Sequence, residues 1–222
     1  MLHVVMSTDS LSLPRPWFQN NPAEMPERFT RLRQTYPLLL ESALRAQFPE
    51  SEVRITNLAV RASSLASSFS HRLELFSWME ADAAVLHKGV VDCWPREALK
   101  GMPNTTLSAF RDSMNRLLDE RARIAPNHPF IVVGISPANG ATMAKNPKIA
   151  ENISAYNAIL SAHSDANTRF IDMEKALRLC ADDVLHPDGH HLTAAGHAIL
   201  AGLLAQAITE LLTPSWRDRE GQ

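Results

Sequence analysis

The sequence predicts an α/β fold with three layers, α/β/α, built around a mostly parallel five-stranded sheet. Short apolar runs alternate with longer amphipathic stretches about five times, which is typical of a parallel sheet with helices on both faces. The composition agrees, since 45% of the 222 residues are apolar and 21% are charged. This length suits one domain with its own core. We expect that domain over residues 1–213 and a polar tail over 214–222.

Strand patterns occupy residues 2–6, 52–58, 83–87, 129–135 and 168–173. The fourth is the clearest, because its sequence PFIVVGI is almost wholly apolar and rich in β-branched residues. Apolar residues at helical spacing mark 36–47, 64–79, 104–124, 147–163 and 192–212. Thr193 is a candidate cap of the last helix. Residues 11–35 form a long Pro-rich loop, of a kind that often binds ligands or acts as a lid.

Charge and cysteine content exclude several functions. The net charge is −2 and no basic run occurs, which argues against nucleic acid as the main partner. The two cysteines, Cys93 and Cys180, lack zinc-type spacing and predict reduced thiols in a cytoplasmic protein. The start MLHVVMSTDS is unlike a signal peptide, and no stretch approaches the ~20 apolar residues of a membrane span. We expect no cofactor and no metal.

Polar segments follow the predicted strands where each one ends. The first strand leads into Ser7–Leu11 (STDSL), the second into 57–64, the third into 88–96, and the last is followed by Asp183-Val-Leu-His186-Pro187. In open parallel sheets, sites form beyond the carboxyl ends of the strands. These segments are therefore predicted to converge on one edge.

The Asp-Ser-Leu turn after the first strand and the late Asp-x-x-His-Pro segment together resemble the SGNH/GDSL hydrolase superfamily. The resemblance implies a flavodoxin-like three-layer fold, with Ser10 as nucleophile and Asp183 and His186 as its partners. The chemistry requires such a set, because a serine hydroxyl needs a base and the base needs a carboxylate to orient it. Asp182 is the alternative to Asp183.

The sequence departs from the family pattern in the oxyanion hole. The resemblance implies donors from the Ser10 backbone, a glycine N–H in the second block and an asparagine side chain in the third. Thr8 replaces a glycine before Asp9, Ala62 replaces the second-block glycine, and Val91 replaces the asparagine. Alanine keeps its N–H but valine has no side-chain donor. Arg61 and Arg96 lie near these positions and could compensate for the missing donor or hold an anionic substrate. Asp92, beside them in the sequence, is a further candidate at the oxyanion or substrate site.

Each assignment has a structural alternative. Ser10 could be a simple turn serine, and Asp9 is expected to brace the loop. Asn57 is expected to tie a strand end to a loop. Four histidines, at positions 186, 190, 191 and 197, invite a metal site, but no HExxH pattern is present. Cys93 would need its own base to act as a nucleophile. Trp17, Phe18 and Trp94 either line a pocket or pack internally.

The predicted function is hydrolysis or transfer of a small acyl ester, with O-acetyl groups on a carbohydrate preferred through the family resemblance. A lipid or thioester hydrolase of the same fold is one alternative. A catalytically degenerate module that binds a glycan is another, suggested by Thr8, Ala62 and Val91.

Overall fold

The computed structural model describes residues 1–15, 29–68 and 80–219. Five strands form one sheet in the order β2-β1-β3-β6-β7, and every neighbouring pair is parallel. The strands are β1 (Leu2–Thr8), β2 (Val53–Asn57), β3 (Ala83–His87), β6 (Phe130–Val133) and β7 (Thr168–Ile171). A separate antiparallel pair joins β4 (Pro95–Arg96) and β5 (Met102–Pro103). The predicted three-layer fold is confirmed.

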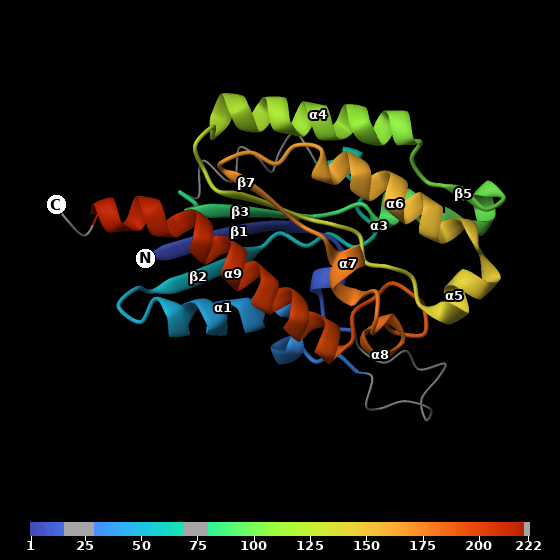
Figure 1. The fold of residues 1–222 in the computed structure, drawn as a ribbon, viewed down its shortest axis with the longest axis horizontal. Coiled ribbons are helices and arrows are strands. Elements are labelled where there is room, and N and C mark those ends of the chain that lie inside the picture. The colour runs from blue at the N-terminus through green and yellow to red at the C-terminus, as the bar shows by residue number, and fades with distance from the viewer. Residues whose placement is uncertain (16–28, 69–79, 220–222) are drawn as a thin grey trace.

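Helices cover both faces of the sheet (Figure 1). One face carries α1 (Tyr36–Gln47) and α9 (Ala194–Arg219), and the other carries α4 (Leu107–Ile124) and α6 (Lys148–Ser161). The alternation of side chains along β1 explains this arrangement, because successive residues of a strand point to opposite faces. Val4 and Met6 are buried in the core beneath α9, whereas Val5 is buried in the core beneath α4.

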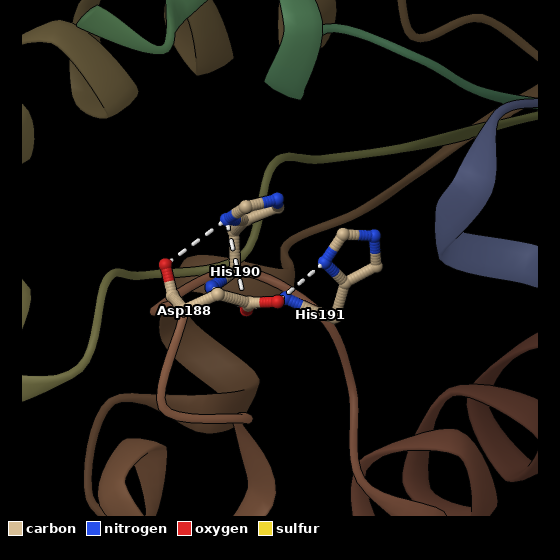
Figure 2. A group of neighbouring side chains, drawn as sticks. All are labelled: Asp188, His190 and His191. Atoms are coloured by element: carbon tan, nitrogen blue, oxygen red, sulfur yellow. Dashed lines mark hydrogen bonds and ion pairs between the residues drawn. The ribbon is translucent and has the colours of Figure 1, made fainter. Parts of the chain in front are cut away.

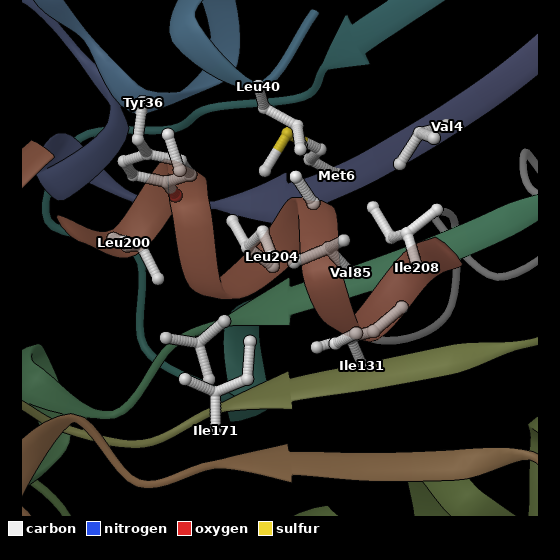
Figure 3. Packing of buried hydrophobic residues seen from close by; sticks show 14 of the residues in the cluster. Val4, Met6, Tyr36, Leu40, Val85, Ile131, Ile171, Leu200, Leu204 and Ile208 are labelled. Carbon is white, nitrogen blue, oxygen red and sulfur yellow. The ribbon is translucent and has the colours of Figure 1, made fainter. Parts of the chain in front are cut away.

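Helix α9 is the main cover of the first core. Leu200, Leu204 and Ile208 are fully buried against strand residues such as Val85 and Ile131 (Figure 3). Its Ala194–Leu212 segment is long and apolar enough to cross a membrane, and 50% of its most apolar window is buried inside the protein. The expectation that no stretch of the chain approaches the length and apolar composition of a membrane span is therefore wrong. The packing against the sheet explains the apolar character as that of a core helix.

The remaining helix predictions have mixed outcomes. Thr193 directly precedes α9, and its Oγ1 lies 3.5 Å from the Gly196 N–H, as expected of a cap. Helix α9 continues to Arg219, beyond residue 212 where the pattern ends, so the polar tail begins as helix. In the predicted 64–79 helix the structure shows a 3-10 turn, η4 (Ala66–Ser68), and residues 69–79 lie outside the described part.

Short elements gather at the carboxyl edge of the sheet. They are the 3-10 turn η1 (Ser10–Ser12) and the helices α3 (Val90–Cys93), α5 (Gly140–Lys145), α7 (Met173–Leu177) and α8 (Ala181–Val184). Because the five strands of the main sheet all run the same way, the segments that follow them meet here. The polar segments singled out in the sequence lie at this edge.

Candidate active site

Ser10 begins the η1 turn directly after β1. Asp9 caps this turn, since its Oδ1 accepts a hydrogen bond from the Leu11 N–H at 2.9 Å. Burial raises the pKa of Asp9 to about 6, while the Leu11 N–H and the charge of Lys88 act in the opposite direction. Asp9 therefore braces the loop, as predicted, and presents the half-buried Ser10 at the end of the strand.

A second polar group ties the end of β1 to the end of β2. Thr8 Oγ1 donates to Asn57 Oδ1 at 2.6 Å and lies 2.6 Å from Ser12 Oγ, and Asn57 Nδ2 donates to Ser12 Oγ at 2.9 Å. The structural role expected for Asn57 is confirmed. Thr8 stands where the family resemblance places a glycine, and its hydroxyl makes it part of this tie.

Ser10 is bonded to a histidine from the opposite end of the chain. Its Oγ lies 3.0 Å from His191 Nε2. His191 Nδ1 in turn lies 2.9 Å from Asp188 Oδ2 (Figure 2). A proton on Nδ1 directed at the carboxylate leaves Nε2 free to accept the Ser10 proton. Asp188, His191 and Ser10 thus form one hydrogen-bonded series.

Asp183 and His186 do not form this series, and the sequence assignment is corrected accordingly. Asp183 is exposed on α8, and the buried His186 places its Nε2 3.4 Å from Thr30 Oγ1. The alternative Asp182 accepts a hydrogen bond from the Gly140 N–H at 2.7 Å. The physical reason is the loop direction, because the backbone turns back between His186 and His191, whose N–H and carbonyl pair at 2.8 Å.

The sequence also carries the same spacing at the pair that the structure places beside Ser10. Asp188-Gly189-His190-His191 repeats the Asp-x-x-His spacing five positions after Asp183. Gly189 makes this turn possible, since its φ of +88° is left-handed and a Cβ there would lie 2.0 Å from Thr142 Oγ1. The Asp188 Oδ1 accepts from the backbone N–H groups of His190 and His191 at 3.2 and 3.1 Å. The turn therefore fixes the carboxylate beside the imidazole.

Electrostatics keep Asp188 ionised. Burial alone would raise the pKa of Asp188, but the hydrogen bond from His191 and the charges of His190 and His191 lower it well below its usual range. Burial, followed by the charge of His191, lowers the pKa of His190 to about 4. His190 is therefore neutral at pH 7, and its ring packs 4.6 Å from the Trp94 ring centroid.

A pocket of about 260 Å³ opens over Ser10 and His191. Apart from these two residues, its lining among the described residues consists of Leu13, Pro14, Arg15, Arg61, Ala62, Val90, Val91, Trp94 and His190. The lining role considered for Trp94 is confirmed, whereas Trp17 and Phe18 lie outside the described residues. The lining thus combines apolar side chains with two arginines, Arg15 and Arg61.

Two backbone N–H groups are available to an oxyanion at this pocket. Both Ser10 and Ala62 line it, and within the described residues neither N–H donates to a protein acceptor. Ala62 adopts a left-handed φ of 54°, the conformation that glycine takes most readily. Val91 also lines the pocket and offers no donor. Arg61, exposed at the same pocket, forms no ion pair with any residue that the structure describes.

Other predicted contributors lie elsewhere. Asp92 is fully buried, accepting from the Leu65 N–H at 2.8 Å and the Thr105 hydroxyl at 2.7 Å, so its expected role in the pocket is wrong. Cys93 is buried, with its Sγ 3.8 Å from the Val90 carbonyl, and is absent from the lining described above. The side chain of Arg96 lies outside the described part of the structure.

The histidine cluster also has the proximity of a metal site. Ligand atoms of Asp188, His190 and His191 lie within 4.8 Å of one another. Asp188 and His191 are already hydrogen-bonded to each other, however, and Asp188 Oδ2 also forms an ion pair with Arg15 Nη2 at 2.5 Å. We therefore assign the group to the series with Ser10. His197 is apart from it, buried and accepting the Tyr36 N–H at 3.1 Å.

Known structures share this fold. An alpha/beta hydrolase from the Lake Arreo metagenome has a TM-score of 0.70 at 17% identity, covering 95% of this chain and 96% of its own. A lipase/acylhydrolase from Enterococcus faecalis has a TM-score of 0.62 at 18% identity, with 95% of this chain and 96% of that protein covered. An acetylxylan esterase from Geobacillus stearothermophilus has a TM-score of 0.67 at 18% identity, with 93% of this chain and 94% of that protein covered.

No curated protein matches the sequence. The model of one protein family does match it, over residues 23–199, which is most of the chain. That match, together with a serine presented at the end of β1 beside a histidine from the last loop, shows that the chain belongs to the GDSL-like lipase/acylhydrolase family.

Proposed function

We propose that this chain is a serine esterase in which Ser10 is the nucleophile, His191 the general base and Asp188 the carboxylate that orients it. The observation that carries the proposal is the unbroken series from Asp188 Oδ2 through His191 to Ser10 Oγ, with distances of 2.9 and 3.0 Å. A degenerate binding module would have no need for this alignment.

The reaction follows from the geometry. Ser10 Oγ attacks the ester carbonyl carbon while its proton moves to His191 Nε2. The N–H groups of Ser10 and Ala62 receive the negative charge that develops on the carbonyl oxygen. The protonated His191 then gives its proton to the departing alcohol, which leaves an acyl group on Ser10. Water, or a hydroxyl of an acceptor, attacks that acyl group and gives its proton to His191. His191 then returns the proton to Ser10 Oγ as the bond between Ser10 and the acyl group breaks.

A small acyl group, such as acetyl on a carbohydrate, fits the pocket best. The pocket volume of about 260 Å³ is below the roughly 300–1,000 Å³ that is typical of sites for drug-sized ligands. Val90 and Val91 supply an apolar surface for the acyl group, and Trp94 supplies a face on which a sugar ring can pack. An acetylxylan esterase is among the proteins of similar fold. Arg61 would hold an anionic group of the substrate or compensate for the donor missing at Val91.

The first experiment compares the two Asp-x-x-His segments with p-nitrophenyl acetate as substrate. We expect Ser10→Ala to abolish turnover and Asp188→Asn to lower kcat by about 10³–10⁴-fold, because the imidazole loses its tautomer and orientation. Asp183→Asn is the matched control, since the same change on an exposed helix should leave kcat within about twofold.

The outcome separates the candidate functions. A larger loss in Asp183→Asn than in Asp188→Asn would restore the assignment based on sequence. Turnover that survives in Ser10→Ala would refute the serine mechanism. Binding of acetylated sugars by a wild-type protein that hydrolyses none of them would favour the degenerate glycan-binding module.

A further inference from the structure

Arg15 makes an ion pair with the carboxylate of the hydrogen-bonded series. Its Nη2 lies 2.5 Å from Asp188 Oδ2, the same oxygen that pairs with His191 Nδ1 at 2.9 Å. The other oxygen, Oδ1, accepts the backbone N–H groups of His190 and His191. Each oxygen of this carboxylate therefore has two donors, which leaves Asp188 little freedom to rotate away from the imidazole.

The backbone around Arg15 is held as well. The Arg15 N–H donates to the Thr30 carbonyl at 3.0 Å, and Thr30 Oγ1 donates to the Leu192 carbonyl at 3.2 Å. Leu192 directly follows His191 in the chain. The guanidinium is thus anchored to the segment that carries the imidazole, and it also forms part of the pocket wall beside Ser10.

We propose that Arg15 is a positioning residue that keeps the Asp188 carboxylate oriented toward His191. This inference rests on the proposed serine mechanism. The geometry gives Arg15 two effects. Its bond fixes the carboxylate, and its positive charge opposes the stabilisation that Asp188 gives to protonated His191. Removing Arg15 should therefore make the imidazole easier to protonate while leaving it less well oriented.

Other charged or titratable groups also act on His191 and stay in place in this test. They come from its own loop, from the turn before Ser10 and from α9, and are Asp188, His190, Asp9 and His197. His186 lies in the same loop and acts on His197. The charge of Arg15 also helps to lower the pKa of His190, so a difference between variants reports the guanidinium acting on the Asp188–His191 pair both directly and through His190.

The experiment compares Arg15→Gln, Arg15→Lys and the wild type. In Arg15→Gln we expect the acidic limb of kcat/KM and the midpoint of the His191 imidazole titration, followed by NMR, to move up by about 0.5–1 pH unit. This size follows from a close charge that is 30% exposed and thus partly screened by solvent. We also expect kcat to fall about tenfold. Arg15→Lys keeps the charge and should keep the limb near its wild-type position while recovering part of kcat.

Arg45→Gln provides the control, because it removes an arginine from an ion pair of equal length, 2.5 Å to Glu41, in the last turn of α1. It should leave the profile and the NMR midpoint unchanged. Coincident NMR midpoints in the wild type and Arg15→Gln would overturn the proposal, and so would a rise in KM alone, which would make Arg15 a substrate contact. The NMR midpoint needs no turnover, so it decides the role of Arg15 even if esterase activity is not found.

Discussion

Ala62 shows how a single residue bears on both the chemistry and the stability of this protein. It lines the pocket with a left-handed φ of 54°, a conformation that costs an L-residue with a Cβ about 1–2 kcal/mol. The family resemblance places a glycine there, which adopts the same angles without the clash. The chain therefore keeps the useful N–H at a cost in stability.

We expect Ala62→Gly to raise the free energy of unfolding by up to about 1 kcal/mol, since relief of strain outweighs the added freedom of the unfolded chain. Esterase activity should stay within about twofold, because the N–H is retained. Chemical denaturation and p-nitrophenyl acetate turnover measure the two effects. A less stable variant would show that Ala62 is not strained.

The histidine beside Ser10 also illustrates what sequence could and could not predict at this scale. The candidate nucleophile Ser10 is predicted from a turn directly after a strand, which is a local pattern. The choice between His186 and His191 depends on where a loop reverses, and that depends on the left-handed Gly189 and on the pairing of Leu185 with Leu192. Spacing alone is the same in both segments, so it could not decide between them.

Among the elements, α3 shows how a short helix can be fixed by one buried carboxylate. Asp92 ties this helix to Leu65 and Thr105, and burial raises its pKa while the Thr105 and Leu65 hydrogen bonds oppose that rise. The tie holds the preceding Val91 against the pocket, where it is 8% exposed. The element is therefore built to present a side chain at the site, yet that side chain carries no donor.

Val91→Asn should restore a donor at this position. We expect kcat to rise about tenfold, a part of the ~10²–10³-fold that one preorganised oxyanion donor is worth in other hydrolases. Val91→Ala is the control, because it opens similar space without a donor and should give no gain. Equal gains in both variants would assign the effect to space, and an unchanged kcat in Val91→Asn would show that the asparagine does not reach the oxyanion.

Element positions were predictable from sequence because β-branched runs and helical spacing are strong local signals. All five predicted strands occur, with ends that differ by at most a few residues. The role assigned to Asp92 was not predictable in the same way. A carboxylate beside a site and a carboxylate buried under a helix have the same sequence neighbours, and only the fold brings Leu65 and Thr105 to it.

Across the whole molecule, the core beneath α1 and α9 contains polar groups that tie these helices to the sheet. Tyr36 on α1 places its hydroxyl 2.9 Å from His87 Nδ1 at the end of β3, and its N–H donates to His197 Nδ1 on α9 at 3.1 Å. Burial, followed by the charge of Lys88, lowers the pKa of His87 to about 3. Burial, followed by the charge of His87, lowers the pKa of His197 to about 3 as well.

These shifts predict loss of stability in acid. Each histidine has an ordinary pKa of 6.5 once the chain unfolds, so between pH 6.5 and about 3 the unfolded chain binds protons that the folded protein does not. Stability therefore falls as pH falls, by up to about 1.4 kcal/mol per pH unit for each histidine. Asp9 has the opposite effect between about pH 6 and 3.8. Because its pKa is higher in the folded protein than in the unfolded chain, the folded protein binds this proton first, and its binding raises stability as pH falls.

His197→Asn tests this assignment, since the asparagine oxygen can still accept the Tyr36 N–H but does not titrate. We expect the variant to be less stable than the wild type at pH 7, because a buried ring is lost. Its free energy of unfolding should fall less steeply on acidification. Between pH 6 and 4 the slope against pH should be smaller by the equivalent of about one proton taken up on unfolding, which is about 1.4 kcal/mol per pH unit. Urea titrations at several pH values measure the two slopes. Parallel slopes would mean that His197 is already protonated in the folded protein or contributes nothing, and the acid sensitivity would then belong to His87 and the loop around His190.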